Sequence, residues 1–159
     1  MSDLSHLDKD GRVNMVDVGD KKITQRIAKA EGKIYINPKI YKAIKKDEIK
    51  KGNVLSTAEI SGVMAAKKVA DMIPLCHQLN LNKIDVNAEL NKGYVKVESM
   101  VKCDGKTGVE MEALQAVSIA LLTVYDMCKA MSKDMEIGEI HLLEKSGGKS
   151  GKYTRSDRK

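Results

Sequence analysis

The chain of 159 residues has almost no aromatic side chains: five tyrosines are present, and phenylalanine and tryptophan are absent. A hydrophobic core must therefore be built from aliphatic residues together with the nine methionines. The shortage of rings also argues against a sheet that binds RNA by stacking bases on aromatic side chains. The three cysteines, at positions 76, 103 and 128, are odd in number and widely spaced, which indicates neither a disulfide framework nor a zinc or iron–sulfur site.

Long hydrophobic runs are lacking as well. No apolar run approaches 18 residues, and the N-terminus has neither the charged nor the apolar region of a signal peptide. We therefore expect a cytoplasmic protein that does not enter a membrane. Hydrophobic residues make up 42% of the chain and charged residues 31%, a composition typical of a globular protein whose length suits one domain.

Basic residues gather in two segments. Residues 21–51 carry eleven basic and three acidic side chains, and residues 145–159 carry six basic and one acidic, within a chain of net charge +6. This distribution favours a polyanionic partner, such as a nucleic acid or a small phosphorylated ligand. A lysine-rich solvated surface without a partner would have the same composition.

Hydrophobic periodicity predicts the secondary structure. Alternation predicts strands over 23–36, 84–90, 95–101 and 137–143, with a hairpin turn at 91–93 between the middle two. A short helix is expected to begin at Asn37-Pro38 and to end by Gly52. Two capping boxes, Ser56–Glu59 and Thr107–Glu110, predict helices that run to about Met72 and Met131. With the extra short helix set aside, the order is βαββαβ, which predicts an α+β, ferredoxin-like antiparallel sheet with helices on one face.

The helix predicted over 107–131 carries more apolar surface than one sheet can cover. Its main stripe is apolar, and a second set of apolar residues lies off this stripe: Ala113, Ala116, Ile119, Ala120 and Leu122. A helix that is apolar nearly all round must bury its second face. Self-association into a symmetric homo-oligomer is the simplest prediction.

A further stripe on this helix contains Glu112, Asp126 and Lys129, with apolar residues between them. Asp126 and Lys129 are spaced i,i+3 and can touch. An exposed ion pair near a helix end is the ordinary interpretation of this spacing. A carboxylate and an amine held in a partly desolvated cleft would instead suit proton transfer.

Three other features can be interpreted in two ways. Lys67 falls on the stripe of Ile60 and Met64, where it either has a function or extends its ammonium out to solvent. Cys76 and His77 are adjacent, but neighbouring side chains usually diverge, so their adjacency does not by itself indicate a catalytic pair. The glycine-rich segment 145–151 fails the phosphate-loop pattern, since Leu143 replaces its first glycine. It is either an anion clamp built from lysines and backbone N–H groups or a mobile tail.

Taken together, eight segments resemble the molybdenum cofactor biosynthesis protein C family of cyclic pyranopterin monophosphate synthases. They are Met15–Val18, Lys51-Gly52, Ala65–Lys67, Asp71–His77, Lys106–Leu114, Tyr125–Ala130, Lys133–Met135 and Lys145–Gly151. The resemblance covers residues 6–152, and so many segments in this order are highly specific. Two departures are visible: Gln78 replaces the proline usual after Cys-His, and the residues after Lys152 match nothing in the pattern.

The resemblance implies a lyase that converts 3′,8-cyclo-7,8-dihydro-GTP to cyclic pyranopterin monophosphate and releases pyrophosphate. It also implies a homohexamer, a trimer of dimers, with sites at subunit interfaces. Asp126 and Lys129 resemble the catalytic pair. The remaining site residues by resemblance contact the substrate: Leu75, Cys76, His77, Met111, Glu112, Lys51, Lys67, Lys145 and Arg26.

The chemistry of such a reaction suits these residue types. Several protons move, so groups that both donate and accept protons are needed, while lysines offset the charge of the leaving pyrophosphate. Glu112 can accept two N–H bonds from a guanine edge. The overall change is a rearrangement plus an elimination, so we expect no cofactor, although magnesium can accompany the triphosphate.

The domain organisation expected from these observations is a flexible arm over 1–20, one catalytic domain over 21–152 and a basic tail over 153–159.

A ferredoxin-like nucleic-acid-binding module is the alternative to the enzyme, because the sequence pI is about 9.1. Only Tyr94 offers a ring for stacking in the predicted hairpin, however. A purely structural oligomer subunit would leave Lys67 and Glu112 on apolar stripes unexplained. The enzyme is therefore the favoured prediction, and we expect it to bind neither nucleic acid nor a membrane.

Overall fold

The computed structural model describes residues 10–156, so the first nine residues of the predicted arm and the last three of the predicted tail lie outside the described residues. The elements in chain order are β1 (Thr24–Tyr35), α1 (Pro38–Lys45), α2 (Val54–Ala66), α3 (Val69–Met72), β2 (Leu81–Asn91), β3 (Tyr94–Gly105), α4 (Glu110–Cys128), β4 (Glu136–Ser146) and β5 (Tyr153–Thr154).

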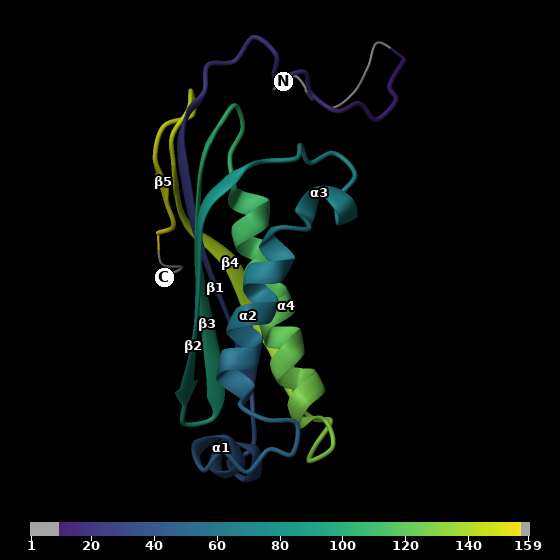
Figure 1. The fold of residues 1–159 in the computed structure, drawn as a ribbon, viewed down its shortest axis with the longest axis vertical. Helices are drawn as coiled ribbons and strands as arrows, with labels where there is room; N and C mark the ends of the chain where they lie inside the picture. The colour runs from purple at the N-terminus through teal and green to yellow at the C-terminus, as the bar shows by residue number, and fades with distance from the viewer. Residues whose placement is uncertain (1–9, 157–159) are drawn as a thin grey trace.

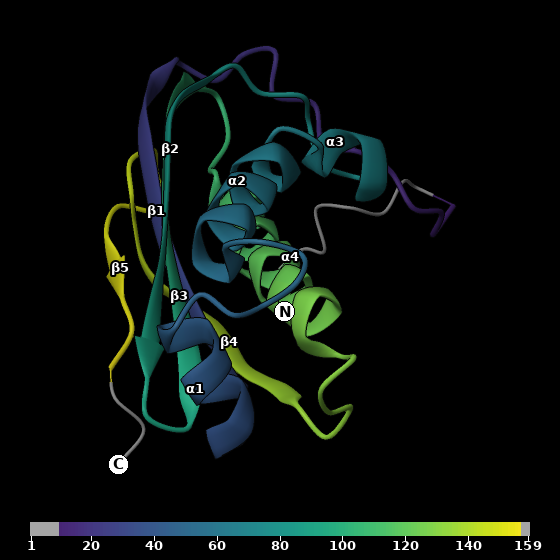
Figure 2. The same cartoon turned by 60° about the horizontal axis from the view of Figure 1, so that its bottom comes forward.

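One antiparallel sheet has the strand order β2-β3-β1-β4-β5. Helices α2 and α4 lie on the same face of this sheet, and α1 lies at one end of it (Figures 1 and 2). The first four strands with α2 and α4 make the βαββαβ arrangement, which confirms the ferredoxin-like α+β prediction. The two-residue strand β5 is an addition at the β4 edge.

The strands form where apolar and polar residues alternate. In β3, Val95, Val97, Ser99 and Val101 are buried under the helices, while Lys96, Glu98 and Met100, which alternate with them, are partly exposed. The predicted hairpin is also present: Asn91 pairs with Tyr94, and Gly93 at the turn has φ of +94°, a left-handed conformation that suits glycine. Strand periodicity and turn chemistry were therefore sufficient to predict this part of the fold.

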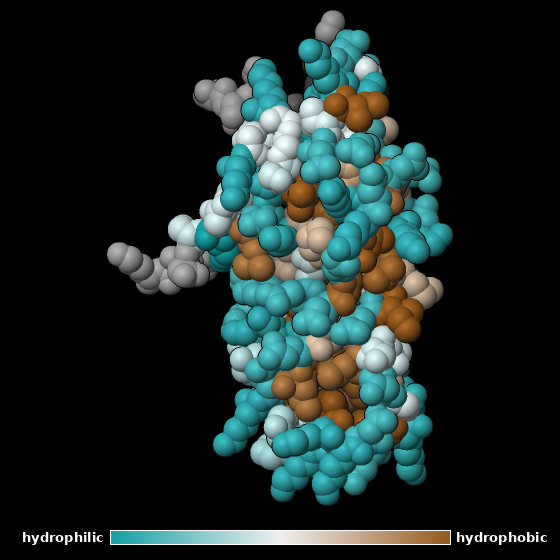
Figure 3. Space-filling model, turned by 60° about the vertical axis from the view of Figure 1, so that its left-hand side comes forward, coloured by the Kyte–Doolittle hydropathy of each residue, from teal (hydrophilic) through white to brown (hydrophobic). Residues whose placement is uncertain are grey.

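Within residues 10–156, no helix lies on the other face of the sheet (Figures 1 and 2). It is lined by cross-strand ion pairs, including Lys29–Glu144 at 3.0 Å and Lys33–Glu139 at 2.6 Å. Figure 3 brings this side of the molecule forward and shows mostly hydrophilic side chains interrupted by apolar patches. An antiparallel sheet with one covered and one polar face is the arrangement that the alternation predicts.

Both predicted capping boxes are wrong. Helix α2 begins earlier, and its cap is Asn53, whose side chain accepts a hydrogen bond of 2.9 Å from the Ser56 amide. Glu59 instead accepts from the Ala88 amide of β2 at 3.0 Å. At α4 the cap residue Val109 has no capping side chain, and Glu110 pairs with Lys145 at 2.8 Å. In both places the glutamate is engaged by a distant strand, a partner that local spacing cannot reveal.

The helix predicted to run to Met72 is broken in two. Helix α2 ends at Ala66, with Lys67 as its C-cap, and α3 follows. Ile60 and Met64 are each 63% exposed, so the stripe that they share with Lys67 faces outward. Lys67 is itself exposed, so it does not interrupt a buried apolar stripe, because α2 packs through small residues on its other side.

The second apolar face of α4 is mostly covered within the chain. Ala113, Ala116 and Ala120 are fully buried, and α2 packs beside them. The two helices approach closely because Gly62 has no side chain: a Cβ there would lie 2.9 Å from the Ala116 carbonyl oxygen. Helix α2 was overlooked as the cover in the sequence-based argument for self-association. Leu122 nevertheless stays 52% exposed.

By length and composition alone, α4 is the one helix of the described residues that is apolar enough to cross a membrane. Half of this stretch is buried between α2 and the sheet. Burial of this kind is what a helix in a protein core shows.

The packing of α4 on β1 makes a prediction about Gly32. A Cβ at this position would lie 2.9 Å from side-chain atoms of Val117, Leu121 and Ile140, and the first two residues are fully buried and have no free space. We expect Gly32→Ala to lower the free energy of unfolding by about 1–3 kcal/mol through overpacking. Gly138→Ala in β4 is the matched control, since a Cβ there would have no neighbouring atom within 4 Å. Equal urea midpoints for the two variants would contradict the expectation.

Candidate active site

The end of α4 carries an ion-pair cluster of three residues. Asp126 lies in the last turn of the helix, and Lys129 follows as its C-cap. One carboxylate oxygen of Asp126 lies 2.7 Å from Lys129 Nζ, and the other lies 2.7 Å from Lys51 Nζ. Lys51, which precedes α2, also donates to the Asp126 main-chain carbonyl at 2.9 Å. The i,i+3 contact expected from the sequence is present, and a third member from another part of the chain joins it.

Electrostatics favour the charged forms of Asp126 and Lys129. Hydrogen bonds from Lys129 and then Lys51 lower the pKa of Asp126 to about 2, and the carboxylate raises the pKa of Lys129. The pair therefore holds Lys129 protonated and Asp126 ionised at neutral pH, and in the single chain it makes the ammonium a weaker acid and the carboxylate a weaker base. All three side chains are about half exposed. The partly desolvated cleft that was expected around this pair is thus not formed by one chain alone.

Glu112 occupies the opposite environment at the start of α4. It is only 4% exposed and lies between two adjoining cavities, of about 310 and 490 Å³, which share Glu112, His77 and Leu79 in their walls. Burial raises the pKa of its carboxyl group, and the nearby charge of Glu110 acts in the same direction. A buried carboxyl group at the base of a cavity is suited to bind a ligand through directed hydrogen bonds.

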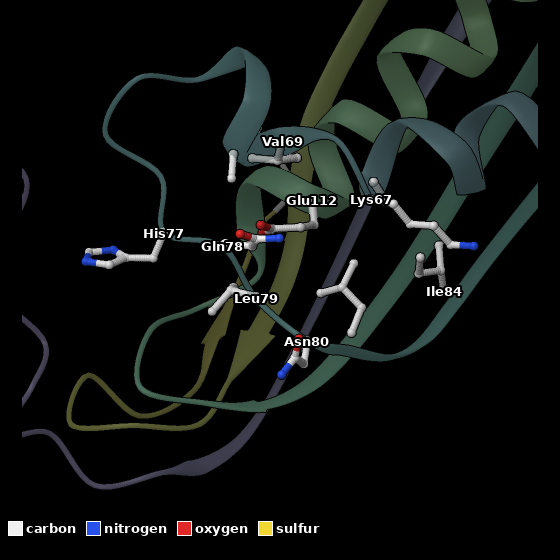
Figure 4. Close-up of a pocket in the computed structure, with 11 residues that line it drawn as sticks. Lys67, Val69, His77, Gln78, Leu79, Asn80, Ile84 and Glu112 are labelled. Carbon is white, nitrogen blue, oxygen red and sulfur yellow. The ribbon is translucent and has the colours of Figure 1, made fainter.

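The C-cap of α2 and the segment between α3 and β2 contribute to the wall of the smaller cavity. Lys67 and Gln78 line the smaller cavity. Gln78 lines this cavity together with Glu112, and Figure 4 shows the Lys67 and His77 side chains extending to opposite sides of it. Gln78, which departs from the family pattern, therefore lies within the candidate site.

The larger cavity contains the remaining residues of the Cys-His segment. Leu75, Cys76 and His77 line it together with Met111. Burial, together with the negative charge of Glu112, raises the pKa of the Cys76 thiol. Cys76 therefore stays protonated near neutral pH, as a wall residue and not as an activated nucleophile.

Lys145 lies at the edge of the larger cavity, whereas Arg26 does not line this cavity and lies under the loop that follows β4. Lys145 pairs with Glu110, which lines that cavity. Strand β4 continues to Ser146, so Lys145 belongs to the sheet and the glycine-rich loop begins at Gly147, two residues later than expected. Arg26 donates to the Gly105 carbonyl at 3.3 Å, and a Cβ on Gly148 would overlap its guanidinium group. The loop thus passes directly over Arg26. Glycine is required at position 147, where φ is +102° and a Cβ would overlap the Gln25 carbonyl oxygen.

The predicted site residues therefore form two clusters and not one. Lys51, Asp126 and Lys129 lie at one end of α4, and the other eight lie around the Glu112 cavities. Glu112 and Asp126 are fourteen residues apart in one helix, which corresponds to about 21 Å along its axis. A small substrate cannot contact both clusters of the same chain.

Sequence reasoning missed part of the cavity wall. Val16, Val18 and Lys21 line the larger cavity, although Val16 and Val18 fall in the segment predicted to be a flexible arm. The alternation of Val16 and Val18 about Asp17 was the available signal, since residues i and i+2 of an extended segment share a face. Glu110 was assigned to a helix cap, and nothing in its spacing indicated its bond to Lys145.

No group of three or more histidine, cysteine, aspartate and glutamate side chains is placed to hold a metal ion within residues 10–156. The charged groups of the two clusters are instead mainly lysines, with Arg26 and two carboxylates. Ammonium and guanidinium groups of this kind bind phosphate by charge and hydrogen bonding.

The ferredoxin-like sheet carries a buried carboxylate in a cavity, basic residues near that cavity and a separate aspartate–lysine pair. This combination is typical of an enzyme that acts on a small anionic molecule. The MoaC family model matches residues 15–148, and the chain belongs to this family. The chain is 51% identical over 152 residues to the cyclic pyranopterin monophosphate synthase of Parvibaculum lavamentivorans, covering 94% of this chain and 95% of the relative. The enzyme of the same name from Campylobacter jejuni is 53% identical over 155 residues, covering 96% and 99%. The corresponding enzyme of a Roseiflexus species is 52% identical over 155 residues, covering 96% and 98%.

The ion-pair cluster makes a prediction about the titration of Asp126. Its carboxyl group should titrate near pH 2 instead of its ordinary 3.8, with the larger contribution from Lys129. Because the folded pKa is lowered, the stabilisation by this group is present above pH 3.8 and is lost as the pH falls toward 2. In NMR titrations, Lys129→Met should raise the midpoint more than Lys51→Met does. The same midpoint in all three proteins would show that the pairs do not persist in solution.

Proposed function

We propose that this protein is a cyclic pyranopterin monophosphate synthase, which converts 3′,8-cyclo-7,8-dihydro-GTP to cyclic pyranopterin monophosphate and pyrophosphate in molybdenum cofactor biosynthesis. The observation that carries the proposal is the identity of about 50% with enzymes of this name over nearly the whole chain. The reaction closes a cyclic phosphate on the α-phosphorus while pyrophosphate leaves, so the products account for all three phosphates. This step belongs to the lyase class and to the cytoplasm.

Each cluster has a proposed role. Glu112 accepts hydrogen bonds from the guanine-derived ring, with Leu75, Cys76, His77 and Met111 as the surrounding wall. Lys51, Lys67, Lys145 and Arg26 position the triphosphate and offset the charge that develops on pyrophosphate. Lys129 and Asp126 transfer protons as a coupled acid and base. No redox cofactor takes part, and magnesium can accompany the phosphates.

The separation of the clusters supports a site shared between two copies of the chain. Because about 21 Å of helix separates Glu112 from Asp126, the ring-binding carboxylate and the acid–base pair must come from different subunits to reach one substrate. The exposed apolar residues Ile60, Met64 and Leu122 lie on α2 and α4 between the clusters and offer a surface for such a contact. Covering Asp126 in the assembly would also reduce its exposure and raise its basicity. We propose a homohexamer, a trimer of dimers, as the assembly.

The direct test is incubation with the cyclised GTP derivative, followed by mass spectrometry for a pterin cyclic phosphate. Formation of this product with one equivalent of pyrophosphate is the expected result. A nucleic-acid-binding module would form no product and would bind RNA with a steep dependence on salt.

The assignment of the acid–base pair makes a prediction about turnover. Asp126→Asn and Lys129→Met should each lower the single-turnover rate by about two to four decades, as the loss of a general acid or base does. Substrate binding should largely persist, because the other basic residues still hold the phosphates. A thermal melt of each variant is the control, and it should show that the oligomer is still folded. Near-wild-type rates in well-folded oligomers would refute the assignment.

A shared site makes a second prediction, which concerns mixtures of inactive variants. Co-assembly of Glu112→Gln with Asp126→Asn should restore activity at up to about a quarter of the sites, because random pairing rebuilds some sites from two intact halves. Mixing Asp126→Asn with Lys129→Met is the control, since both changes affect the same cluster and no intact half can form. Activity equal to the sum of the separate variants would show that each site is made by one chain.

A further inference from the structure

The larger cavity is closed on one side by a short segment that precedes β1, residues 16–21, which we call the strap. Val16, Val18 and Lys21 contribute its cavity wall. Val16 and Val18 are half-buried, whereas Val13 and Met15 are 71% and 47% exposed. The chain before β1 crosses the same end of the fold as α3 (Figures 1 and 2). The strap thus presents two valines to the cavity, which Leu75 and Met111 line from other elements.

The strap has a defined local conformation. The Lys21 amide donates to the Val18 carbonyl at 3.1 Å, which closes a turn over residues 18–21. Asp17 accepts a hydrogen bond of 2.7 Å from the Gly19 amide. The peptide group between Gly19 and Asp20 lies at the centre of this turn, and its carbonyl oxygen accepts a hydrogen bond from another part of the fold.

Lys106 binds this carbonyl oxygen. Its Nζ donates to the Gly19 oxygen at 2.5 Å, joining the strap to the loop between β3 and α4. The same loop supplies Thr107 and Gly108 to the cavity wall. One ammonium group therefore connects two walls of the cavity that are 87 residues apart in sequence.

We infer that Lys106 is a positioning residue that holds the strap closed over a ligand in the larger cavity, and that the strap retains the substrate through the apolar contacts of Val16 and Val18. This inference rests on the proposed function for the identity of the ligand, a guanine-derived ring. Lys106 acts through the Gly19 carbonyl and not on the reacting atoms. Its loss therefore releases substrate faster and leaves the chemical step intact.

The experiment compares Lys106→Met, which removes the ammonium group but keeps most of the length of the side chain, with Lys106→Arg, which restores a donor. Lys102→Met is the matched control, because Lys102 is a half-buried lysine of β3 whose replacement removes one positive charge close by in sequence. Two quantities are measured: the rate of trypsin cleavage after Lys21 in the substrate-free protein, and kcat and KM with the cyclised GTP derivative.

In Lys106→Met, both strap cleavage and KM should rise about three- to tenfold, as expected for the loss of one solvent-exposed charged hydrogen bond, while kcat stays within about twofold. Lys106→Arg should recover most of both effects, and Lys102→Met should match the wild type. An unchanged cleavage rate in Lys106→Met would overturn the inference that Lys106 holds the strap closed. Faster cleavage with an unchanged KM would overturn the role of the strap in holding substrate. If the wild type makes no pterin product but Lys106→Met is still cleaved faster, the role of Lys106 in holding the strap is supported. The proposed function is then refuted instead.

Discussion

The close packing of α4 between α2 and the sheet is the constraint on which the rest of the structure depends. It is possible only because small residues line both contacts: Gly62 on α2, Gly32 on β1 and the alanines of α4. With few aromatic residues available, close approach of backbones replaces large side chains as the means of excluding water from the core. The straight, buried helix then determines where its two polar ends lie.

Those two ends place two carboxylates in opposite environments. Glu112 is buried at the N-terminal end, and burial raises its pKa; Asp126 is exposed at the other end, and two lysines lower its pKa. One group is thus suited to bind a ligand by directed hydrogen bonds and the other to remain charged beside a proton donor. In the proposed assembly, each end of the helix completes a site with the opposite end of a second copy.

Local pattern was a good guide to the elements and a poor guide to their boundaries. Alternation in β2 and β3 and the Lys92-Gly93 turn are properties of neighbouring residues, so the hairpin could be predicted. The capping boxes failed because Glu59 and Glu110 have better partners on β2 and β4 than the nearby amides. A side chain that can cap a helix can equally bond a distant strand, and only packing decides between the two.

The sequence by itself determined the fold class and the contact between Asp126 and Lys129, because both follow from spacing within single elements. The family resemblance located the site residues along the chain but not in space. The tertiary structure decided that Lys51 joins Asp126 across 75 residues of sequence and that the segment before β1 lines the larger cavity. Periodicity determines which face of an element a residue occupies. The element that packs against that face depends on docking, because docking is set by the shape and volume of all the side chains together.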